Sequence, residues 1–146
     1  MGRDCAADAR SRRTATLIAF LDTNVLIRHL TGDPPEMAAR ATAALAGEEQ
    51  LLVTDLVLAE CVYVLESFYE VERSRIAELM RSVIVFPSID TVDTPVLLRT
   101  LEIYELDRLD FAEAYLVAHA EATGVGKILS FDRSIDRIKT VTRREP

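Results

Sequence analysis

The 146-residue sequence has little of what marks disulfide-stapled, low-complexity or membrane-spanning proteins. Its two cysteines, Cys5 and Cys61, are too few for a disulfide framework or a cysteine metal cluster, so a reducing cytoplasm is the simplest setting. Five glycines and five prolines leave no low-complexity segment and no linker. The apolar runs fall far short of the roughly 20 residues that cross a bilayer, so we expect no transmembrane helix.

What remains is the composition of an ordinary globular domain. Hydrophobic residues make up 49% of the chain and charged residues 28%, and the length suits one domain with a real core. The net charge of −7 argues against a general nucleic-acid coat, although a local basic groove is compatible with it. Residues 1–16 carry four arginines but no following apolar stretch, which excludes a signal peptide. We predict a disordered lead-in at 1–16 and a single domain at 17–146.

The domain opens with an apolar run, an acidic turn and a second apolar run. Residues 17–21 predict a buried strand, and residues 25–30 predict a helix. Asp22 stands between them, followed by Thr23 and Asn24, which are residue types that cap helices. This order puts a carboxylate at the carboxyl edge of a sheet, where open α/β folds place their sites. Because an unpaired buried carboxylate is costly, Asp22 is expected to have a partner.

Helical and strand-like segments alternate along the rest of the sequence. Helices are expected at 36–46, 56–69, 73–82, 95–105 and 110–122, with Asp55 as a cap for the second of them. Strands are expected at 51–54 and 127–130, and residues 83–86 are either a strand or a helix end. This alternation indicates βαβ units, a mainly parallel sheet and helices on both of its faces.

Acidic residues recur at strand ends or on inward helical faces. Glu60 has apolar neighbours three and four positions away on its helix, so its carboxylate should face the core side. A buried salt bridge, or an edge position that reaches solvent, is the alternative for Glu60. Asp132 follows a strand as Asp22 does, although aspartate there is also typical of a turn or cap. Asp110 and Glu113 open a helix with the spacing of a capping box, which competes with a functional role.

Carboxylates that converge in one pocket require cations to stay ionised. Oxygen ligands without a histidine or cysteine pattern suit Mg²⁺ or Mn²⁺ rather than zinc. A carboxylate-held Mg²⁺ mostly acts on phosphate esters. His29 and His119 lie on predicted helices, where packing or surface roles are expected. The sequence contains neither a Ser–His–Asp set nor a glycine-rich phosphate loop.

Four segments together resemble the PIN domain, and in particular the VapC-like toxins of bacterial toxin–antitoxin pairs. They are FLDTNVLI at 20–27, AE at 59–60, LDFAEAYL at 109–116 and LSFDR at 129–133. The resemblance runs from about residue 18 to residue 138. It implies a three-layer α/β/α sandwich with a central, mainly parallel sheet and an acidic Mg²⁺ pocket. It also implies a single-strand-directed endoribonuclease.

The resemblance assigns roles to individual residues. Asp22 and Glu60 would be the first two acidic ligands and Asp132 the fourth. Glu113 stands at the third position, where the family usually has aspartate, and Asp110 one turn earlier is the alternative third ligand. Side chains that would orient ligands or the attacking water are Thr23, Asn24 and Ser130. An auxiliary ligand is in doubt, because Ser134 and Ile135 stand where the family often has Asp and Phe.

The implied reaction is hydrolysis of an RNA phosphodiester by an in-line water, which leaves 5′-phosphate and 3′-hydroxyl ends. The RNA backbone needs positive side chains, and the candidates near the motifs are Arg28, Arg108, Arg133 and Arg137. The resemblance further implies a cognate antitoxin and a homodimer. The apolar helices between residues 56 and 80 offer a surface for such contacts.

Two other interpretations compete with the nuclease. A phosphatase of the haloacid dehalogenase type would use Asp22 as nucleophile, but Asn24 stands where that family needs a second aspartate. The lysine and cap region of that family are also missing. An interaction module that binds antitoxin or RNA without cutting is the second alternative, since Glu113 alters the third ligand.

Overall fold

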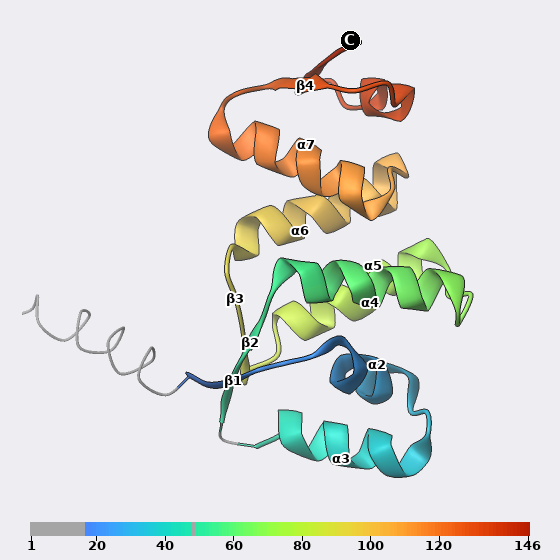
Figure 1. Ribbon diagram of the computed structural model, residues 1–146, viewed down its shortest axis with the longest axis vertical. Coiled ribbons are helices and arrows are strands. Elements are labelled where there is room, and N and C mark those ends of the chain that lie inside the picture. The colour runs from blue at the N-terminus through green and yellow to red at the C-terminus, as the bar shows by residue number, and fades with distance from the viewer. Residues whose placement is uncertain (1–16, 48) are drawn as a thin grey trace, which may run out of the picture.

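The computed structural model describes residues 17–47 and 49–146, so the lead-in predicted at 1–16 lies outside the described residues. Figure 1 shows the order of the elements. The first half contains β1 (Leu17–Phe20), α2 (Thr23–Thr31), α3 (Pro35–Leu45), β2 (Gln50–Val53), α4 (Asp55–Ser67) and α5 (Arg73–Ile84). The second half contains β3 (Ile89–Thr91), α6 (Thr94–Glu102), a π-helical turn (Ile103–Asp107), α7 (Phe111–Thr123), β4 (Lys127–Leu129), a 3₁₀ turn (Arg133–Arg137) and β5 (Thr142–Arg144).

Local capping explains where the helices near the acidic residues begin and end. Asp22 is the N-cap of α2, and its carboxylate accepts a hydrogen bond from the backbone N–H of Thr23. Gly32 ends the helix with φ of 70°, a left-handed conformation that glycine adopts without a steric penalty. At α4, Thr54 is the N-cap and accepts from the Val57 N–H, so the predicted cap at Asp55 is wrong by one residue.

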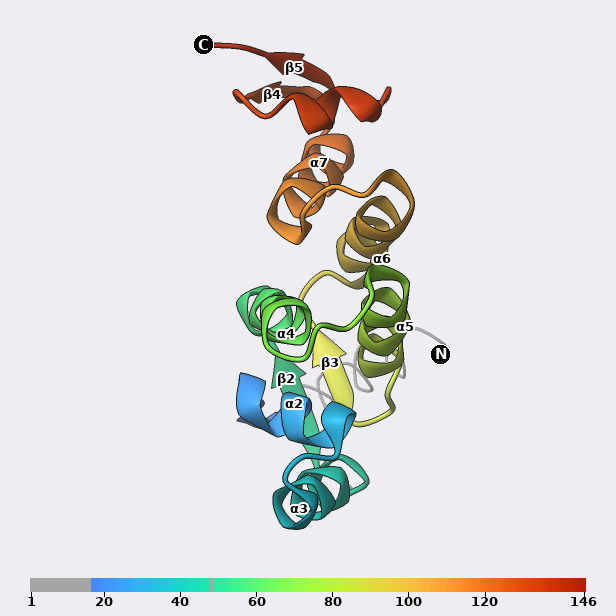
Figure 2. The same ribbon diagram turned by 90° about the vertical axis from the view of Figure 1, so that its right-hand side faces the viewer.

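All the strand pairs described are parallel, as predicted. In the first sheet, with order β1-β2-β3, Phe20 lies beside Leu52, and Leu52 lies beside Asp90. The second sheet pairs β4 with β5, with Ile128 beside Arg143. The strands therefore divide between two sheets instead of forming one. Figures 1 and 2 show the reason: α6 and α7 lie between β1–β3 and the β4–β5 pair, which sits at the far end of the molecule.

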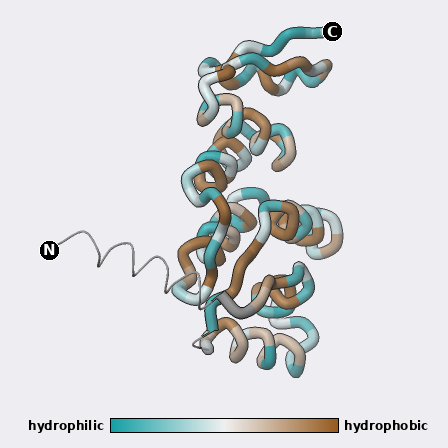
Figure 3. The backbone as a smooth tube through the Cα atoms, turned by 60° about the vertical axis from the view of Figure 1, so that its left-hand side comes forward, coloured by the Kyte–Doolittle hydropathy of each residue, from teal (hydrophilic) through white to brown (hydrophobic). Residues whose placement is uncertain are grey.

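The helices α2 to α5 lie to one side of β1–β3 in Figure 1, while the chain in Figure 3 shows hydrophobic segments both in these strands and in the helices beside them. A continuous buried core joins this part to α6, the π-helical turn and α7 through Leu58, Met80, Leu101, Tyr104 and Phe111. None of the described helices is both long and apolar enough to cross a membrane. Side-chain packing in the continuous core sets the position of α6 and α7.

Short elements account for the differences from the predicted boundaries. Residues 83 and 84 end α5, and the strand that follows is β3 at Ile89–Thr91. The helix expected at 95–105 ends at Glu102 and continues as the π-helical turn. β5 was not predicted. Strands of three residues contain too few alternations to give a periodic signal.

Candidate acidic site

Asp22 and Glu60 come together at the carboxyl end of β1. The Thr23 hydroxyl donates a hydrogen bond to the Glu60 carboxylate, while the backbone N–H of Thr23 donates to Asp22 at 2.8 Å. Both carboxylates line a pocket of about 420 Å³. The residues that line this acidic pocket are Asp22, Thr23, Asn24, Ile27, Arg28, Glu60, Val64, Phe68 and Tyr69. The sequence predicts a partner for the Asp22 carboxylate. That partner is the Thr23 backbone N–H at the start of α2, and Glu60 is a neighbour.

Both carboxylates are exposed, which corrects the expectation that Glu60 faces the core. The helix α4 is apolar on most of its surface, and its buried stripe consists of Leu58, Cys61, Val62 and Leu65. Glu60 lies just outside that stripe and meets α2 at the open end of the parallel strands. The low amphipathicity of α4 explains why periodicity placed this residue on the wrong side.

The negative charge of the pocket acts on the buried thiol beside it. Burial raises the pKa of Cys61 to about 12, and the charges of Glu60 and then Asp22 add to this shift. Cys61 itself is fully buried. Cys61 is therefore an unreactive thiol, and the charges of the two carboxylates contribute to its raised pKa.

Asp132 lies at the other end of the molecule, after β4. Its carboxylate accepts from the backbone N–H of Ser134 at 2.9 Å, and its own N–H donates to the Ser130 hydroxyl at 2.9 Å. The pKa of Asp132 is lowered by the hydrogen bonds from Ser134, with smaller contributions from Arg137 and Arg143. Asp132 therefore caps the 3₁₀ turn, and this chain does not bring it to Asp22.

Asp110 and Glu113 stand at the start of α7. Asp110 occupies the N-cap position, but its side chain makes no capping hydrogen bond, so the capping-box alternative is wrong. Its carboxylate lies 3.8 Å from the Arg73 guanidinium and is largely exposed. Glu113 is half-buried in the first turn and does not line the acidic pocket. Among the described residues, no three His, Cys, Asp or Glu side chains gather as one metal site.

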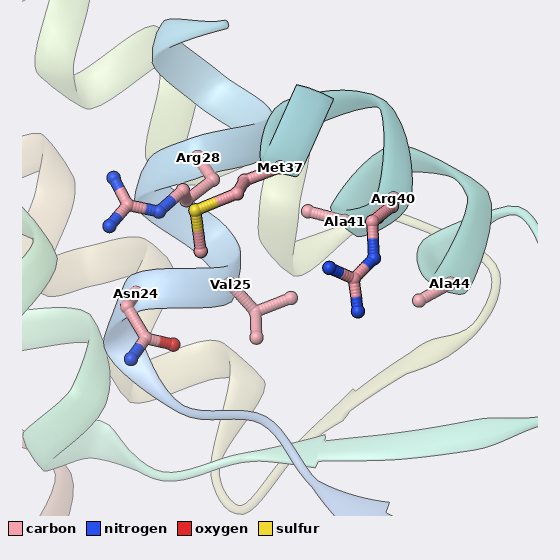
Figure 4. A pocket seen from close by; sticks show the side chains of 7 residues that line it. All are labelled: Asn24, Val25, Arg28, Met37, Arg40, Ala41 and Ala44. Atoms are coloured by element: carbon pink, nitrogen blue, oxygen red, sulfur yellow. The ribbon is translucent and has the colours of Figure 1, made fainter. Parts of the chain in front are cut away.

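A basic groove adjoins the acidic pocket, between α2 and α3. Figure 4 shows its lining, with the guanidinium groups of Arg28 and Arg40 and the amide of Asn24. The groove has a volume of about 320 Å³. Arg28 lines both cavities, and its buried Nε has no hydrogen-bond partner among the described residues. Arg40 was missed from the sequence because it lies outside every motif, and only the packing of α3 on α2 brings it here.

The other three predicted arginines lie near Asp132. Arg137 donates to the backbone carbonyls of Asp107 and Arg108 at 3.3 Å. Arg108 ends the π-helical turn with φ of 58°, and Arg133 is exposed at the start of the 3₁₀ turn. Of the four arginines predicted to contact RNA, Arg28 thus lies beside the acidic pocket and the other three lie at the other end of the molecule.

The two histidines have packing roles, as expected. His29 Nδ1 lies 2.8 Å from the Thr42 hydroxyl and its ring meets Phe86 edge to face. His119 packs edge to face on Tyr115, with ring centroids 4.5 Å apart. Neither ring lines the acidic pocket.

The donor chemistry of the acidic pocket fits a hard divalent cation. Asp22, Glu60 and Asn24 offer oxygen donors, and the pocket contains no sulfur or imidazole donor. Mg²⁺ is commonly held by only one or two carboxylates, with water and substrate phosphate completing its coordination. Two carboxylates are therefore enough to hold such an ion, and further carboxylates would tighten the site.

Comparison with known families agrees with this geometry. A family model described as PIN domain matches residues 19–141, a range that contains all four motif segments. No individual curated protein matches the chain significantly. The match, together with the six α-helices and the parallel strands of residues 17–47 and 49–146, confirms the predicted three-layer α/β/α fold class.

Proposed function

Because the chain belongs to the PIN domain family, generally a metal-dependent nuclease fold, we propose that it is an endoribonuclease that hydrolyses RNA phosphodiester bonds. One observation carries the proposal: Thr23 donates hydrogen bonds to both Asp22 and Glu60, and the two carboxylates lie beside a basic groove. Nucleic-acid hydrolysis needs negative charge to hold a cation and positive charge to hold phosphates. Both occur here on adjoining surfaces.

Asp22 and Glu60 would hold the divalent cation, Mg²⁺ or Mn²⁺, and Asn24 lines the same pocket. Such an ion activates water and stabilises the leaving oxygen of a phosphate ester. Thr23 fixes the orientation of both carboxylates through two hydrogen bonds, so it is a positioning residue. The other carboxylates predicted as ligands do not line this pocket: Asp132 caps the 3₁₀ turn, and Asp110 and Glu113 stand at the start of α7.

The basic groove is proposed to bind the RNA backbone. Arg28 and Arg40 both line this groove, with the Met37 side chain between their guanidinium groups in Figure 4, and guanidinium binds phosphate oxygens in a bidentate manner. The Arg28 guanidinium is held in place by a hydrogen bond from its Nη1 to the Asp33 carbonyl at 3.2 Å. An RNA strand along this groove would present a phosphodiester to the acidic pocket, because Asn24 and Arg28 line both cavities.

We further propose that the nuclease acts as the toxin of a toxin–antitoxin pair. Leu56 and Tyr63 on α4, and Phe68 at its C-cap, are exposed apolar side chains, 71%, 69% and 75% exposed. Phe68 also lines the acidic pocket, so a partner that covers these side chains would block the pocket. Inducible expression of the chain should arrest growth, and expression of an Asp22→Asn variant should not.

Cleavage of a defined RNA pool tests the nuclease. The purified full chain is incubated with Mg²⁺, with Mn²⁺ or with chelator, and the cut ends are mapped. We expect discrete, metal-dependent cuts with 5′-phosphate and 3′-hydroxyl ends, lost in Asp22→Asn and Glu60→Gln. Glu78→Gln is the matched control, because Glu78 is an exposed carboxylate on α5 that pairs with Arg75.

The same experiment separates cutting from binding alone. Retention of RNA without cuts in either metal, from folded protein, would favour the interaction module over the nuclease. The structure gives that alternative one specific support, since only two of the predicted carboxylates line the acidic pocket.

A further inference from the structure

Phe68 is a large apolar side chain that lines a charged pocket and is left open to solvent. It is 75% exposed, yet it lines the acidic pocket together with the Asp22 and Glu60 carboxylates. Leu56 and Tyr63 are also exposed on α4, but neither of them lines that pocket. Among these exposed side chains, Phe68 is therefore placed to contact whatever the two carboxylates bind.

The helix α4 sets the distance between the Phe68 ring and the carboxylates. Glu60, Val64 and Phe68 follow one another at intervals of four residues, so they lie along one side of the helix. Phe68 is the C-cap of α4, and its N–H donates to the Val64 carbonyl at 3.0 Å. At about 1.5 Å per residue, Phe68 stands about 12 Å along the axis from Glu60. A stacked strand advances about 3.4 Å per nucleotide, so a base a few nucleotides from a phosphate at the carboxylates reaches the ring.

Tyr69 holds the Phe68 ring in place. The two rings meet edge to face, with centroids 4.9 Å apart and an interplanar angle of 74°. The Tyr69 N–H donates to the Val64 carbonyl at 3.3 Å, and Glu70 then turns the chain with φ of 52°. The Tyr69 hydroxyl donates to the Asp33 carboxylate at 3.4 Å, in the loop between α2 and α3. The aromatic pair is thus fixed to two segments before any ligand binds, which lowers the cost of binding.

The same loop residue holds a positive charge beside the aromatic pair. Arg28 donates from Nη1 to the Asp33 backbone carbonyl at 3.2 Å, and Arg28 and Tyr69 both line the acidic pocket. The pocket therefore presents carboxylates for a cation, a guanidinium for a phosphate and an aromatic ring for a base. A nucleotide engages all three groups. An apolar peptide would cover the ring and leave the cation and the guanidinium without a partner.

We propose that Phe68 stacks on an unpaired base of the RNA strand whose phosphate lies at Asp22 and Glu60. Bases in a duplex are already stacked on their neighbours, so the ring favours nucleotides that are free to turn outward. Every base has a π-face, so this contact positions the strand without reading its sequence. The inference rests on the proposed nuclease function, because it needs RNA in the acidic pocket.

Binding without cleavage tests the stacking directly. In an Asp22→Asn background, which keeps the RNA intact, the affinity for a fluorescein-labelled unstructured RNA is measured by anisotropy in Mg²⁺. Phe68→Leu removes the ring and keeps an apolar side chain, so the affinity should fall roughly 5- to 100-fold. Phe68→Tyr should restore it. Tyr63→Leu is the matched control, because it removes a ring that is 69% exposed on the same helix but lies outside the pocket.

An abasic scan locates the stacked base. The same RNA is prepared with one abasic nucleotide at each position in turn. The Asp22→Asn protein should lose affinity at one position, and the further Phe68→Leu change should cost nothing more there, because the ring and the base belong to one contact. Losses that add at every position overturn the stacking.

The remaining outcomes separate this inference from the nuclease itself. In an otherwise wild-type chain, Phe68→Leu should raise the KM for RNA and leave kcat nearly unchanged, because stacking is the same before and during the reaction. Unchanged affinity in Phe68→Leu, or an equal loss in Tyr63→Leu, overturns the stacking and leaves Phe68 to the proposed protein partner, even if the wild type cuts RNA. A chain that binds RNA through Phe68 and cuts none supports the stacking and overturns the nuclease.

Discussion

The Thr23 hydroxyl donates a hydrogen bond to Glu60 at 2.5 Å, joining α2 to a residue 37 positions later in the chain. The backbone N–H of Thr23 also holds Asp22, so one residue orients two carboxylates. Thr23→Val keeps the shape of the side chain and removes the donor, which leaves Glu60 free to turn. We expect cleavage and Mg²⁺ affinity to fall about 10- to 100-fold, measured by single-turnover kinetics and calorimetric titration.

Two variants control for general damage to α2. Thr31→Val lies on the same helix and removes a hydroxyl that donates to the Ile27 carbonyl, so it should leave cleavage unchanged. Thr23→Ser restores the donor and should recover most of the activity. Wild-type rates in Thr23→Val would contradict the positioning role of Thr23.

The basic groove should make the affinity for RNA depend on salt concentration. Arg40→Gln removes one of its two guanidinium groups without touching the acidic pocket, which Arg40 does not line. RNA binding should weaken for all sequences, and the slope of log affinity against log salt should fall by about 1. Fluorescence anisotropy in chelator measures this without cleavage. Arg75→Gln is the control on α5, and an equal loss in both variants would reject a specific groove.

The sequence predicted the fold class and the position of Asp22 in an acidic pocket after the first strand, because both depend on local patterns. A strand, an acidic cap and a helix occupy consecutive residues at 17–31, so their geometry follows from capping and periodicity. The position of Glu60 beside Thr23 was available only through the family resemblance. Its exposure was predicted wrongly, because α4 is apolar on most of its surface.

What the sequence did not predict depends on long-range packing. Asp22 and Asp132 look equivalent in sequence, since each follows a short apolar strand, yet these two strands belong to different sheets. The packing of Tyr104, Phe111 and their neighbours decides how far α7 carries Asp132 from Asp22. Arg40 likewise joins the site only because α3 packs on α2. Contacts of this kind leave no periodic signal in one sequence.

A charged pair should stabilise the segment that carries β4 and β5. The Arg99 guanidinium of α6 donates twice to the Glu121 carboxylate of α7, at 2.9 and 3.0 Å, and Thr140 donates to the same carboxylate. The bonds from Arg99, then that from Thr140, lower the pKa of Glu121 despite its partial burial. Glu121→Gln should reduce the free energy of unfolding by about 1 kcal/mol at neutral pH, measured by urea denaturation.

The pH dependence of that loss follows from the direction of the shift. A carboxyl whose pKa is lowered by folding stabilises the protein above its unfolded pKa, and this stabilisation is lost as the pH falls through the folded value. The difference between wild type and Glu121→Gln should therefore shrink in acid. Glu102→Gln is the control, because Glu102 also pairs with Arg99 but is 53% exposed. A difference that does not change with pH would contradict the assignment.

The hydrogen bond from Tyr115 to Asp55 should hold α7 against α4. This bond, with burial second, raises the pKa of Tyr115 to about 12. A phenol whose pKa is raised by folding stabilises the protein below its unfolded pKa, and this stabilisation is lost as the pH rises through about 12. Tyr115→Phe removes the donor, and one oxygen of Asp55 is already buried without a partner among the described residues. We expect a loss of about 1–3 kcal/mol near neutral pH, measured by urea denaturation.

Ultraviolet titration of the tyrosines gives a second readout of this contact. The wild type should contain Tyr104 and Tyr115 as late-ionising tyrosines, because burial and a carboxylate partner raise the pKa of each. Tyr115→Phe should lose one of them, whereas Tyr63→Phe should keep both, because the side chain of Tyr63 is 69% exposed. An unchanged number of late-ionising tyrosines in Tyr115→Phe, together with unchanged stability, would contradict the assignment of the raised pKa to the contact between Tyr115 and Asp55.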